Sequence, residues 1–140
     1  MRNLHAATFQ DFLRQRSALQ RQVSIKLAFI DLCAGDHMAA LMLSLVVDQV
    51  ARPGSSDHPD GWVRMPWVFT WGRARMTRKK GRQLLNRLVR LGYCQTKVMR
   101  FQGAPTLHVR LCEQAFMAAW RGVLNGQAPM YLDDADVSGQ

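Results

Sequence analysis

The stretch that decides the fold, residues 77–92, reads TRKKGRQLLNRLVRLG. At helical spacing its four leucines fall on one side, while its polar and basic residues fall on the other. Thr77 occupies the position of an N-cap, and Gly92 that of the left-handed residue that ends many helices. The spacing therefore predicts an amphipathic helix over residues 77–91 with its leucines against a core. These leucines are Leu84, Leu85, Leu88 and Leu91.

The first turn of this predicted helix carries three positive charges, from Arg78, Lys79 and Lys80. The free N–H groups and the dipole at a helix N-terminus favour anions rather than cations. Such a start is unfavourable unless an anion binds there, and a nucleic-acid backbone supplies phosphates that suit the position. We therefore expect this helix to lie against nucleic acid.

Two segments of strand-like composition follow the helix. Residues 106–111 alternate polar and apolar side chains with period two, and residues 93–101 do so roughly. Residues 102–105 contain Gly and Pro, which favour a loop. The pattern predicts a β-hairpin over residues 93–111. A basic helix followed directly by a basic hairpin suggests the recognition helix and wing of a winged helix-turn-helix domain.

The charge of the chain is concentrated in one block. The 140 residues carry a net charge of +9, but residues 61–110 hold twelve Lys and Arg and no Asp or Glu. A solvated surface normally mixes charges of both signs. The block therefore indicates a polyanionic partner, with a protein that is merely kept soluble by its charge as the alternative.

Length and composition predict one ordinary domain with a real core, since 48% of the residues are hydrophobic. The three cysteines are far apart and form no C-x-x-C motif, which is typical of reduced thiols in the cytoplasm. The histidines and cysteines show no metal-ligand spacing. The longest apolar stretch, residues 38–47, is too short to span a membrane. We expect a cytoplasmic protein without metal, cofactor or small-molecule ligand.

Three parts are expected along the chain. Residues 1–21 form an N-terminal helical arm, with a helix over 7–21; residues 22–124 form the main domain, and residues 125–140 a flexible acidic tail.

Within the main domain, residues 22–29 alternate and predict a first short strand. Asp36 then caps the most apolar helix, residues 37–51, which should be the buried centre of the fold.

The remaining elements follow the same logic. A polar loop over residues 52–61 precedes a brief strand at residues 62–65. Pro66 opens a short helix over 66–75, although the alternation there would also suit a strand. Residues 113–124 predict a last amphipathic helix, with Phe116, Met117, Trp120 and Leu124 at core spacing. Core and hairpin packing is the expected role of Trp62, Trp67 and Trp71, with stacking on single-stranded bases as a minor alternative.

These features occur in a familiar order. An apolar helix, a polar loop, the Gly-Trp-Val strand at residues 61–63 and a short helix precede Thr77, and Arg82 follows that cap by five residues. In this order residues 36–111, about half of the chain, resemble the winged-helix domains of phage and plasmid replication proteins, of the replisome-organiser and replication-initiator type. The resemblance implies an α+β, mostly helical fold: a winged helix-turn-helix with an additional N-terminal arm and C-terminal helix.

Two departures from the family pattern stand out. Gly81 occupies a position where the family usually has an apolar residue, so another backbone is expected to approach it. The helix over residues 66–75 has two Trp and no acidic residue, whereas the family usually shows Glu or Asp there. This helix could therefore contact phosphate through Arg73 and Arg75, or carry a partner surface.

The candidate DNA-binding residues divide into groups. Lys79, Arg82, Gln83 and Asn86 project opposite the leucines and could reach base edges, since Arg pairs with guanine and Gln or Asn with adenine. Phosphate contacts suit Arg73, Arg75, Arg78, Lys80, Arg87 and Arg90. Thr77, the N-cap, is also counted among the DNA-binding residues. The hairpin could contact the DNA backbone or the minor groove through Lys97, Arg100 and Arg110.

The sequence predicts a non-enzymatic protein that binds duplex DNA in the replication, maintenance or transcription regulation of a mobile element. No phosphate-binding loop, zinc-protease motif or convincing carboxylate pair supports catalysis. The alternative is a phage- or plasmid-encoded interaction subunit or inhibitor that docks into a larger nucleoprotein complex. The arm at residues 7–21 and the helix over 66–75 would then be its working surfaces, and a homodimer is compatible with either function.

Overall fold

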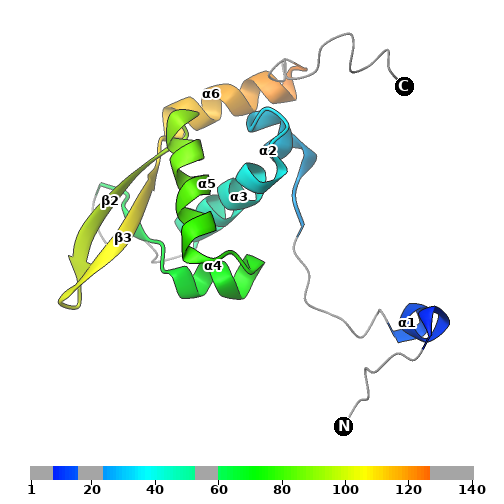
Figure 1. Ribbon diagram of the computed structural model, residues 1–140. Helices are drawn as coiled ribbons and strands as arrows, with labels where there is room; N and C mark the ends of the chain where they lie inside the picture. Colours follow the sequence, from blue (N-terminus) through cyan, green and yellow to red (C-terminus); the bar gives the residue numbers. More distant parts are fainter. Residues whose placement is uncertain (1–7, 16–23, 53–59, 127–140) are drawn as a thin grey trace.

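The structure is a computed structural model that describes residues 8–15, 24–52 and 60–126. These residues form six helices and one three-stranded antiparallel sheet, in the order α1–α2–α3–β1–α4–α5–β2–β3–α6 (Figure 1). The predicted α+β, mostly helical class is confirmed. The acidic tail from residue 127, most of the polar loop over 52–61 and much of the N-terminal arm lie outside the described residues.

Helix α3, His37–Ala51, forms the centre of the core. Asp36 caps it as predicted, because its side chain accepts a hydrogen bond from the Ala39 backbone N–H at 3.0 Å. Buried residues lie on most of its sides, and α2, α5 and β3 all pack against it. They are Ala39, Ala40, Leu41, Met42, Leu43, Leu45 and Val46. The prediction of a buried central helix over residues 37–51 is confirmed.

The strand predicted over residues 22–29 is wrong, because Leu27–Leu32 forms helix α2. Phe29, Leu32 and Cys33 are buried at helical spacing, whereas Leu27, counted in the alternating set, is 79% exposed. In a helix, positions three and four apart share a face, and this face packs on α3 and α6. Packing against the core therefore favours a helix here, although the alternating side chains suggested a strand.

Helix α4, Trp67–Ala74, follows the short strand β1, Val63–Arg64. The helix predicted over residues 66–75 is therefore confirmed, and the strand that was also considered for these residues is not formed. Arg75 then adopts a left-handed backbone with φ of 55°, which reverses the chain before Thr77.

Helix α5, Arg78–Arg90, begins where the sequence predicts. The Thr77 hydroxyl accepts a hydrogen bond from the Lys80 backbone N–H at 3.2 Å, as an N-cap does. Gly92, with φ of 87°, follows its end. Gly81 is buried under the ring of Trp67 rather than under another backbone, so that expectation is wrong.

Strands β2, Cys94–Phe101, and β3, Ala104–Leu111, form a hairpin that projects from the helices (Figure 1). Its two-residue turn, Gln102-Gly103, has positive φ at both residues, as a type I′ turn requires. The loop predicted over 102–105 is therefore too long, because Ala104 and Pro105 pair within the ladder. Strand β1 pairs with β3, giving the order β1-β3-β2.

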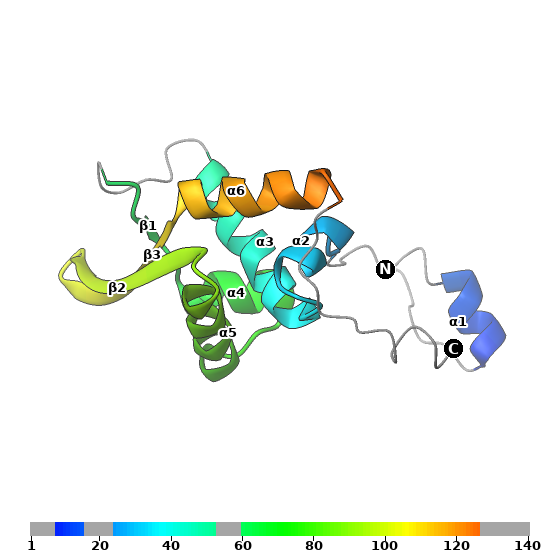
Figure 2. The same ribbon diagram turned by 90° about the horizontal axis from the view of Figure 1, so that it is seen from above.

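Helix α6, Glu113–Leu124, has the predicted bounds and lies across the outside of α2 (Figure 2). Phe116 and Trp120 pack on Phe29 through edge-to-face contacts of 6.2 and 6.0 Å between ring centroids. Met117 and Leu124, expected in the core, are instead 38% and 65% exposed. The core covers only one side of this helix, so two of its four predicted core residues face outward.

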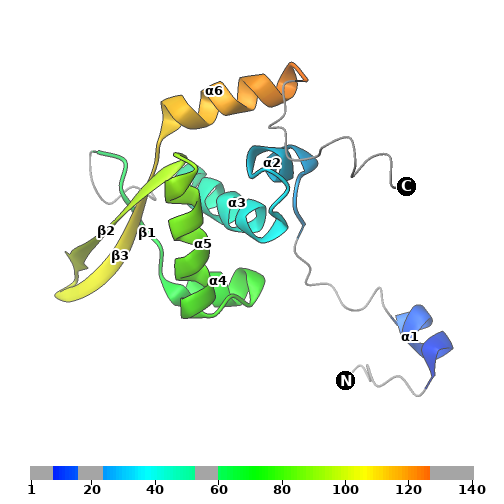
Figure 3. The ribbon, with the colours of Figure 1, turned by 45° about the horizontal axis from the view of Figure 1, so that its top comes forward.

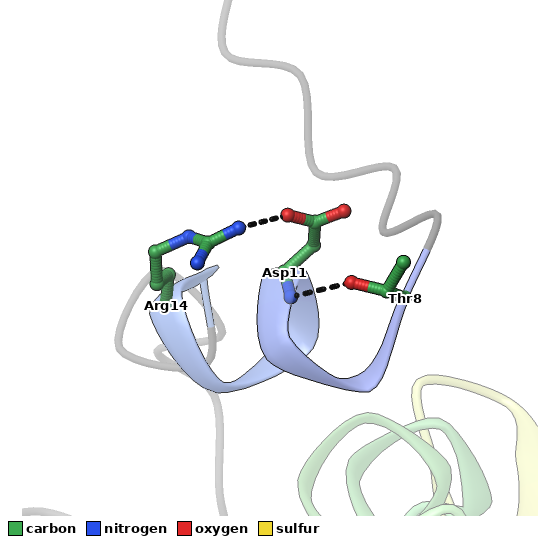
Figure 4. Close-up of polar contacts among 3 residues, drawn as sticks. All are labelled: Thr8, Asp11 and Arg14. Atoms are coloured by element: carbon green, nitrogen blue, oxygen red, sulfur yellow. Dashed lines mark hydrogen bonds and ion pairs between the residues drawn. The ribbon is translucent and has the colours of Figure 1, made fainter.

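Helix α1, Phe9–Gln15, is the described part of the N-terminal arm. The Thr8 hydroxyl accepts a hydrogen bond from the Asp11 backbone N–H, and Asp11 pairs with Arg14 one turn on (Figure 4). Residues 16–21 of the predicted helix lie outside the described ranges. Among the helices that are described, none has the length and apolar composition to cross a membrane.

Candidate nucleic-acid interface

Helix α5 and the hairpin bound an open cleft of about 890 Å³. Residues of the N-terminal half of α5 line one wall, and residues of the hairpin line another. The ribbon in Figure 3 shows the hairpin running from the C-terminal end of α5 away from the helix. The α5 wall consists of Arg78, Lys79, Arg82, Gln83 and Asn86. These five residues were all predicted to bind DNA, and the structure brings them together on one surface.

The internal packing of α5 explains why these residues share a surface. Gly81, Leu84, Leu85 and Leu88 are buried against the core, so the opposite side of the helix is left in solvent. Three cations and two amides therefore face the cleft. No acidic side chain is among the described residues that line it. The cleft thus presents positive charge with side chains that can both donate and accept hydrogen bonds.

The other surfaces of the cleft are largely apolar. Met65, Pro66 and Trp67 line it from the β1–α4 connection. Apolar and hydroxyl groups of the hairpin complete it, from Val98, Pro105, Thr106 and Leu107. Apolar groups beside cations suit a ligand that has both charged and hydrophobic parts, as a nucleotide chain does.

The hairpin residues of the cleft were not among the predicted site residues. The register places Val98 opposite Leu107 and Arg100 opposite Pro105. A two-residue turn at Gln102-Gly103 would have fixed this register from sequence, because hairpin pairing follows from the length of the turn. The four-residue loop that was predicted instead removed Pro105 from the strand.

The other basic residues predicted on α5 lie outside the cleft. Lys80 and Arg90 are exposed but do not line it. Arg87 is half-buried and points to the start of α3, with its Nε 3.7 Å from Asp36 Oδ2. A weak ion pair of this kind orients the guanidinium more than it stabilises the fold.

The two arginines of the preceding helix are held by their own neighbours. Arg73 pairs with Asp48 at 3.3 Å, and its guanidinium lies 5.3 Å from the ring centre of Phe69. Arg75 donates to the Trp71 carbonyl at 3.2 Å. Both side chains remain exposed, and neither lines the cleft.

The basic residues of the hairpin also lie outside the cleft. Lys97 and Arg100 are exposed on β2, and Arg100 donates to the Gly103 carbonyl at 3.1 Å. Arg110 contacts Gln95 and stacks 4.8 Å from the ring centre of Trp62. Trp62 therefore packs on the hairpin as predicted.

The other two tryptophans differ in burial. Trp67 packs partly on the core and lines the cleft. Trp71 is 51% exposed, so its predicted core role is wrong. Trp67 and Trp71 are one turn apart on α4, but only Trp67 packs against the core.

Two thiols and a hydroxyl outside the cleft are buried in the fold. Burial raises the pKa of the Cys33 and Cys94 thiols to about 12, with smaller contributions from Asp36 and from Cys112 respectively. Buried Thr70 donates to the Trp67 carbonyl at 3.0 Å. Among the described residues, no group of three or more His, Cys, Asp or Glu could hold a metal ion.

Comparisons of the chain with models of protein families, with curated proteins and with solved structures give no match. The resemblance of residues 36–111 to replication-protein winged-helix domains therefore stays a prediction from the residues themselves. The geometry of the cleft is the main support for a function.

Proposed function

We propose that the protein binds duplex DNA through a winged helix-turn-helix domain, in which α5 is the recognition helix and the β2–β3 hairpin is the wing. The observation that carries this proposal is the cleft between them, with its three cations, two amides and no described acidic lining residue. A cationic surface of this kind attracts a polyanion, and its amides offer hydrogen bonds to base edges.

The N-terminal half of α5 would make the central contacts. Lys79, Arg82, Gln83 and Asn86 are exposed at spacings of three and four residues, so they form one face of the helix. The major groove is about 12 Å wide and admits one α-helix. Arg82 would then pair with guanine and the amides with adenine, while Arg78 and Lys80 hold phosphates.

Basic residues around the cleft would extend the phosphate contacts. Lys97 and Arg100 lie on β2, one of the two edge strands of the sheet. From there they could reach the DNA minor groove or the sugar-phosphate backbone. Arg73 and Arg75 flank the start of α5, and their contacts with Asp48 and Trp71 limit their freedom. Side chains that are already oriented lose less conformational entropy on binding.

The biological setting in this proposal rests on the family resemblance alone. It favours a cytoplasmic, non-enzymatic role in the replication, maintenance or transcription regulation of a plasmid, phage or related mobile element. Winged-helix domains occur in proteins with each of these roles, so the fold alone does not distinguish between the roles.

A second candidate function is docking to another protein through α4. Val68 and Trp71, three residues apart on this helix, are 82% and 51% exposed. Exposed apolar side chains that share a helix face are typical of interaction sites. An interaction subunit or inhibitor would bind through this face and would not need the charges of the cleft.

The test is a titration of fluorescent random-sequence duplex DNA at several salt concentrations. Phosphate contacts predict that log K falls linearly with log salt. Lys79→Glu should weaken binding at least tenfold. Lys26→Glu changes the net charge equally at the N-cap of α2, a helix that lies away from the hairpin (Figures 1 and 2), and should have little effect. Circular dichroism melting curves check that both variants fold.

Two results would overturn DNA binding through the cleft. One is the absence of binding at low salt, and the other is an equal loss in both charge variants. If Val68→Ser or Trp71→Ser abolishes the capture of a protein partner while Lys79→Glu does not, the interaction function is supported instead.

A further inference from the structure

Helix α6 is apolar in composition yet poorly covered. None of its twelve residues, all of them described, is buried. Phe116, Ala119, Trp120 and Val123 pack on the core but stay partly exposed. Because the core contacts only this side, the rest of an apolar helix is left in water, where it favours association.

One exposed stripe of α6 has an ordered pattern of charge. Glu113, Met117 and Arg121 are spaced by four residues, so they lie along one side of the helix. Leu124 continues the same side and is 65% exposed, and Met117 is 38% exposed. The stripe thus has an acid at one end, an apolar centre, and a base followed by a leucine at the other end.

This pattern is complementary to itself when the direction of the helix is reversed. Met117 lies midway between Glu113 and Arg121, four residues from each. In an antiparallel pair of such helices, the acid of each copy therefore lies opposite the base of the other. A two-fold interface requires this kind of self-matching surface.

We propose that the protein forms a two-fold dimer through α6, with Met117 at the axis and Glu113 opposite Arg121 of the partner subunit. Among the described residues, neither Glu113 nor Arg121 has an ion-pair partner within its own chain. Both charges are therefore available to a second copy. Reversed helix dipoles also favour the antiparallel arrangement.

Charge distinguishes a second copy from other occupants of this face. The chain carries +9 overall, and Glu113 is its only glutamate. A polyanion would prefer the acid-free block around α5, and a strongly acidic protein partner would be repelled by Glu113. A surface with one charge of each sign around an apolar centre instead fits its own copy.

The position of α6 is compatible with the cleft remaining open. In Figures 1 and 3, α6 lies beside the C-terminal end of α5, whereas α4 lies at the other end. The cleft is lined by the N-terminal half of α5, from Arg78 to Asn86. A helix of this length spans about 18 Å, so the interface is small and we expect a weak, concentration-dependent dimer.

The experiment is sedimentation velocity of the full chain over a range of concentrations, without DNA. Glu113→Arg or Arg121→Glu alone converts both symmetric charge pairs into repulsive pairs, and each should weaken dimerisation about tenfold. The double variant, Glu113→Arg with Arg121→Glu, restores opposite charges and should return dimerisation to within about threefold of the original. Lys26→Glu, which reverses the charge of an exposed residue outside α6, is the matched control and should leave dimerisation unchanged.

A cross-link tests whether position 117 lies at the two-fold axis. Met117→Cys, made with Cys112→Ser, places one thiol at the proposed axis, while Cys33 and Cys94 are buried. Mild oxidation should convert this variant to a covalent dimer.

Several outcomes would overturn the α6 dimer. They are a monomer at all concentrations, a dimer that ignores the single reversals, a double variant that fails to recover, or no cross-link at position 117. Because none of these measurements uses DNA binding, failure of the proposed function would leave the result unchanged.

Discussion

The ring of Trp67 in α4 lies over Gly81 in α5 so closely that a Cβ atom at position 81 would be 2.5 Å from Trp67 Cζ3. Because position 81 has no side chain, α4 and α5 can approach each other closely. Their distance fixes the shape of the part of the cleft that both helices line. A glycine here is unfavourable for the helix itself, by about 1 kcal/mol relative to alanine. Packing therefore explains a residue that helix propensity disfavours.

Gly81→Ala should destabilise the protein despite its better helix propensity. Displacing the ring costs about 1–3 kcal/mol, as overpacking of cores generally does, which outweighs the propensity gain of about 1 kcal/mol. Urea unfolding of the single variant and of Gly81→Ala with Trp67→Leu measures this effect. The double variant should recover part of the loss, and a more stable Gly81→Ala would contradict the contact.

Asp36 links α3 to α5, because one carboxylate oxygen caps α3 and the other lies 3.7 Å from Arg87. Asp36→Ala should cost about 0.5–2 kcal/mol of unfolding free energy through loss of the cap. Asp36→Asn keeps an acceptor for the Ala39 N–H and should cost much less. Equal losses in urea unfolding would show that the ion pair, rather than the cap, matters.

Tyr93 ties the start of the hairpin to α2, since its hydroxyl donates to the Leu32 carbonyl at 2.5 Å. Burial, with a smaller contribution from Cys33, raises the pKa of this phenol and keeps it protonated. Tyr93→Phe should destabilise the fold by about 1–3 kcal/mol, because a buried carbonyl loses its donor. A chemical-denaturation midpoint equal to that of the parent would rule this contribution out.

The buried thiols predict a loss of stability at high pH. In the folded chain the pKa of Cys33 and Cys94 is about 12, against 9.0 for an ordinary thiol. Below pH 9 both states keep these protons, but between pH 9 and 12 the unfolded state binds fewer protons, so unfolding becomes more favourable. Urea unfolding across this range should show a shallower decline for Cys94→Ala than for the parent.

The same burial protects these thiols from reagents near pH 8. A thiol-specific dye should react rapidly with Cys112 alone, which is half-buried, and with all three cysteines after unfolding. Rapid labelling of two or three thiols in the folded protein would contradict the burial of Cys33 and Cys94.

The salt dependence of DNA binding can be assigned to single residues. If Lys80 contacts a phosphate, as proposed, Lys80→Ala should reduce the slope of log K against log salt by about one. Lys26→Ala removes the same charge just before α2 and should leave the slope unchanged. Equal slopes for both variants would place the phosphate contacts away from Lys80.

The sequence predicted the elements that carry local signals of their own. Helices α3 and α5 combine an N-cap, at Asp36 and Thr77, with apolar side chains at helical spacing. Helix α6 has the same spacing without a side-chain cap, and its bounds were still predicted. The five basic and amide residues of the α5 wall follow from the same periodicity, because burying the leucines leaves one face free.

What the sequence did not predict depends on contacts between distant segments. Helix α2 looked like a strand because Ile25, Leu27 and Phe29 alternate, and only packing on α3 and α6 selects the helix. The pairing of Arg87 with Asp36, 51 residues away, removed one predicted phosphate contact from the cleft. No local rule contains either interaction.

The sheet has a consequence for the stiffness of the cleft. Strand β1 pairs with β3 only near Val109 and His108, so the outer part of the hairpin is a two-stranded ribbon. Near its tip, the Arg64 guanidinium lies 3.8 Å from the ring centre of Phe101, and Arg100 donates to the Gly103 carbonyl. Helix α5, in contrast, is anchored on the core along its whole buried side. Two-stranded ribbons twist and bend more readily than wider sheets. Any molecule seated in the cleft therefore meets one rigid wall and one compliant wall, and amide protons of the hairpin should exchange faster toward Gln102 than toward its base.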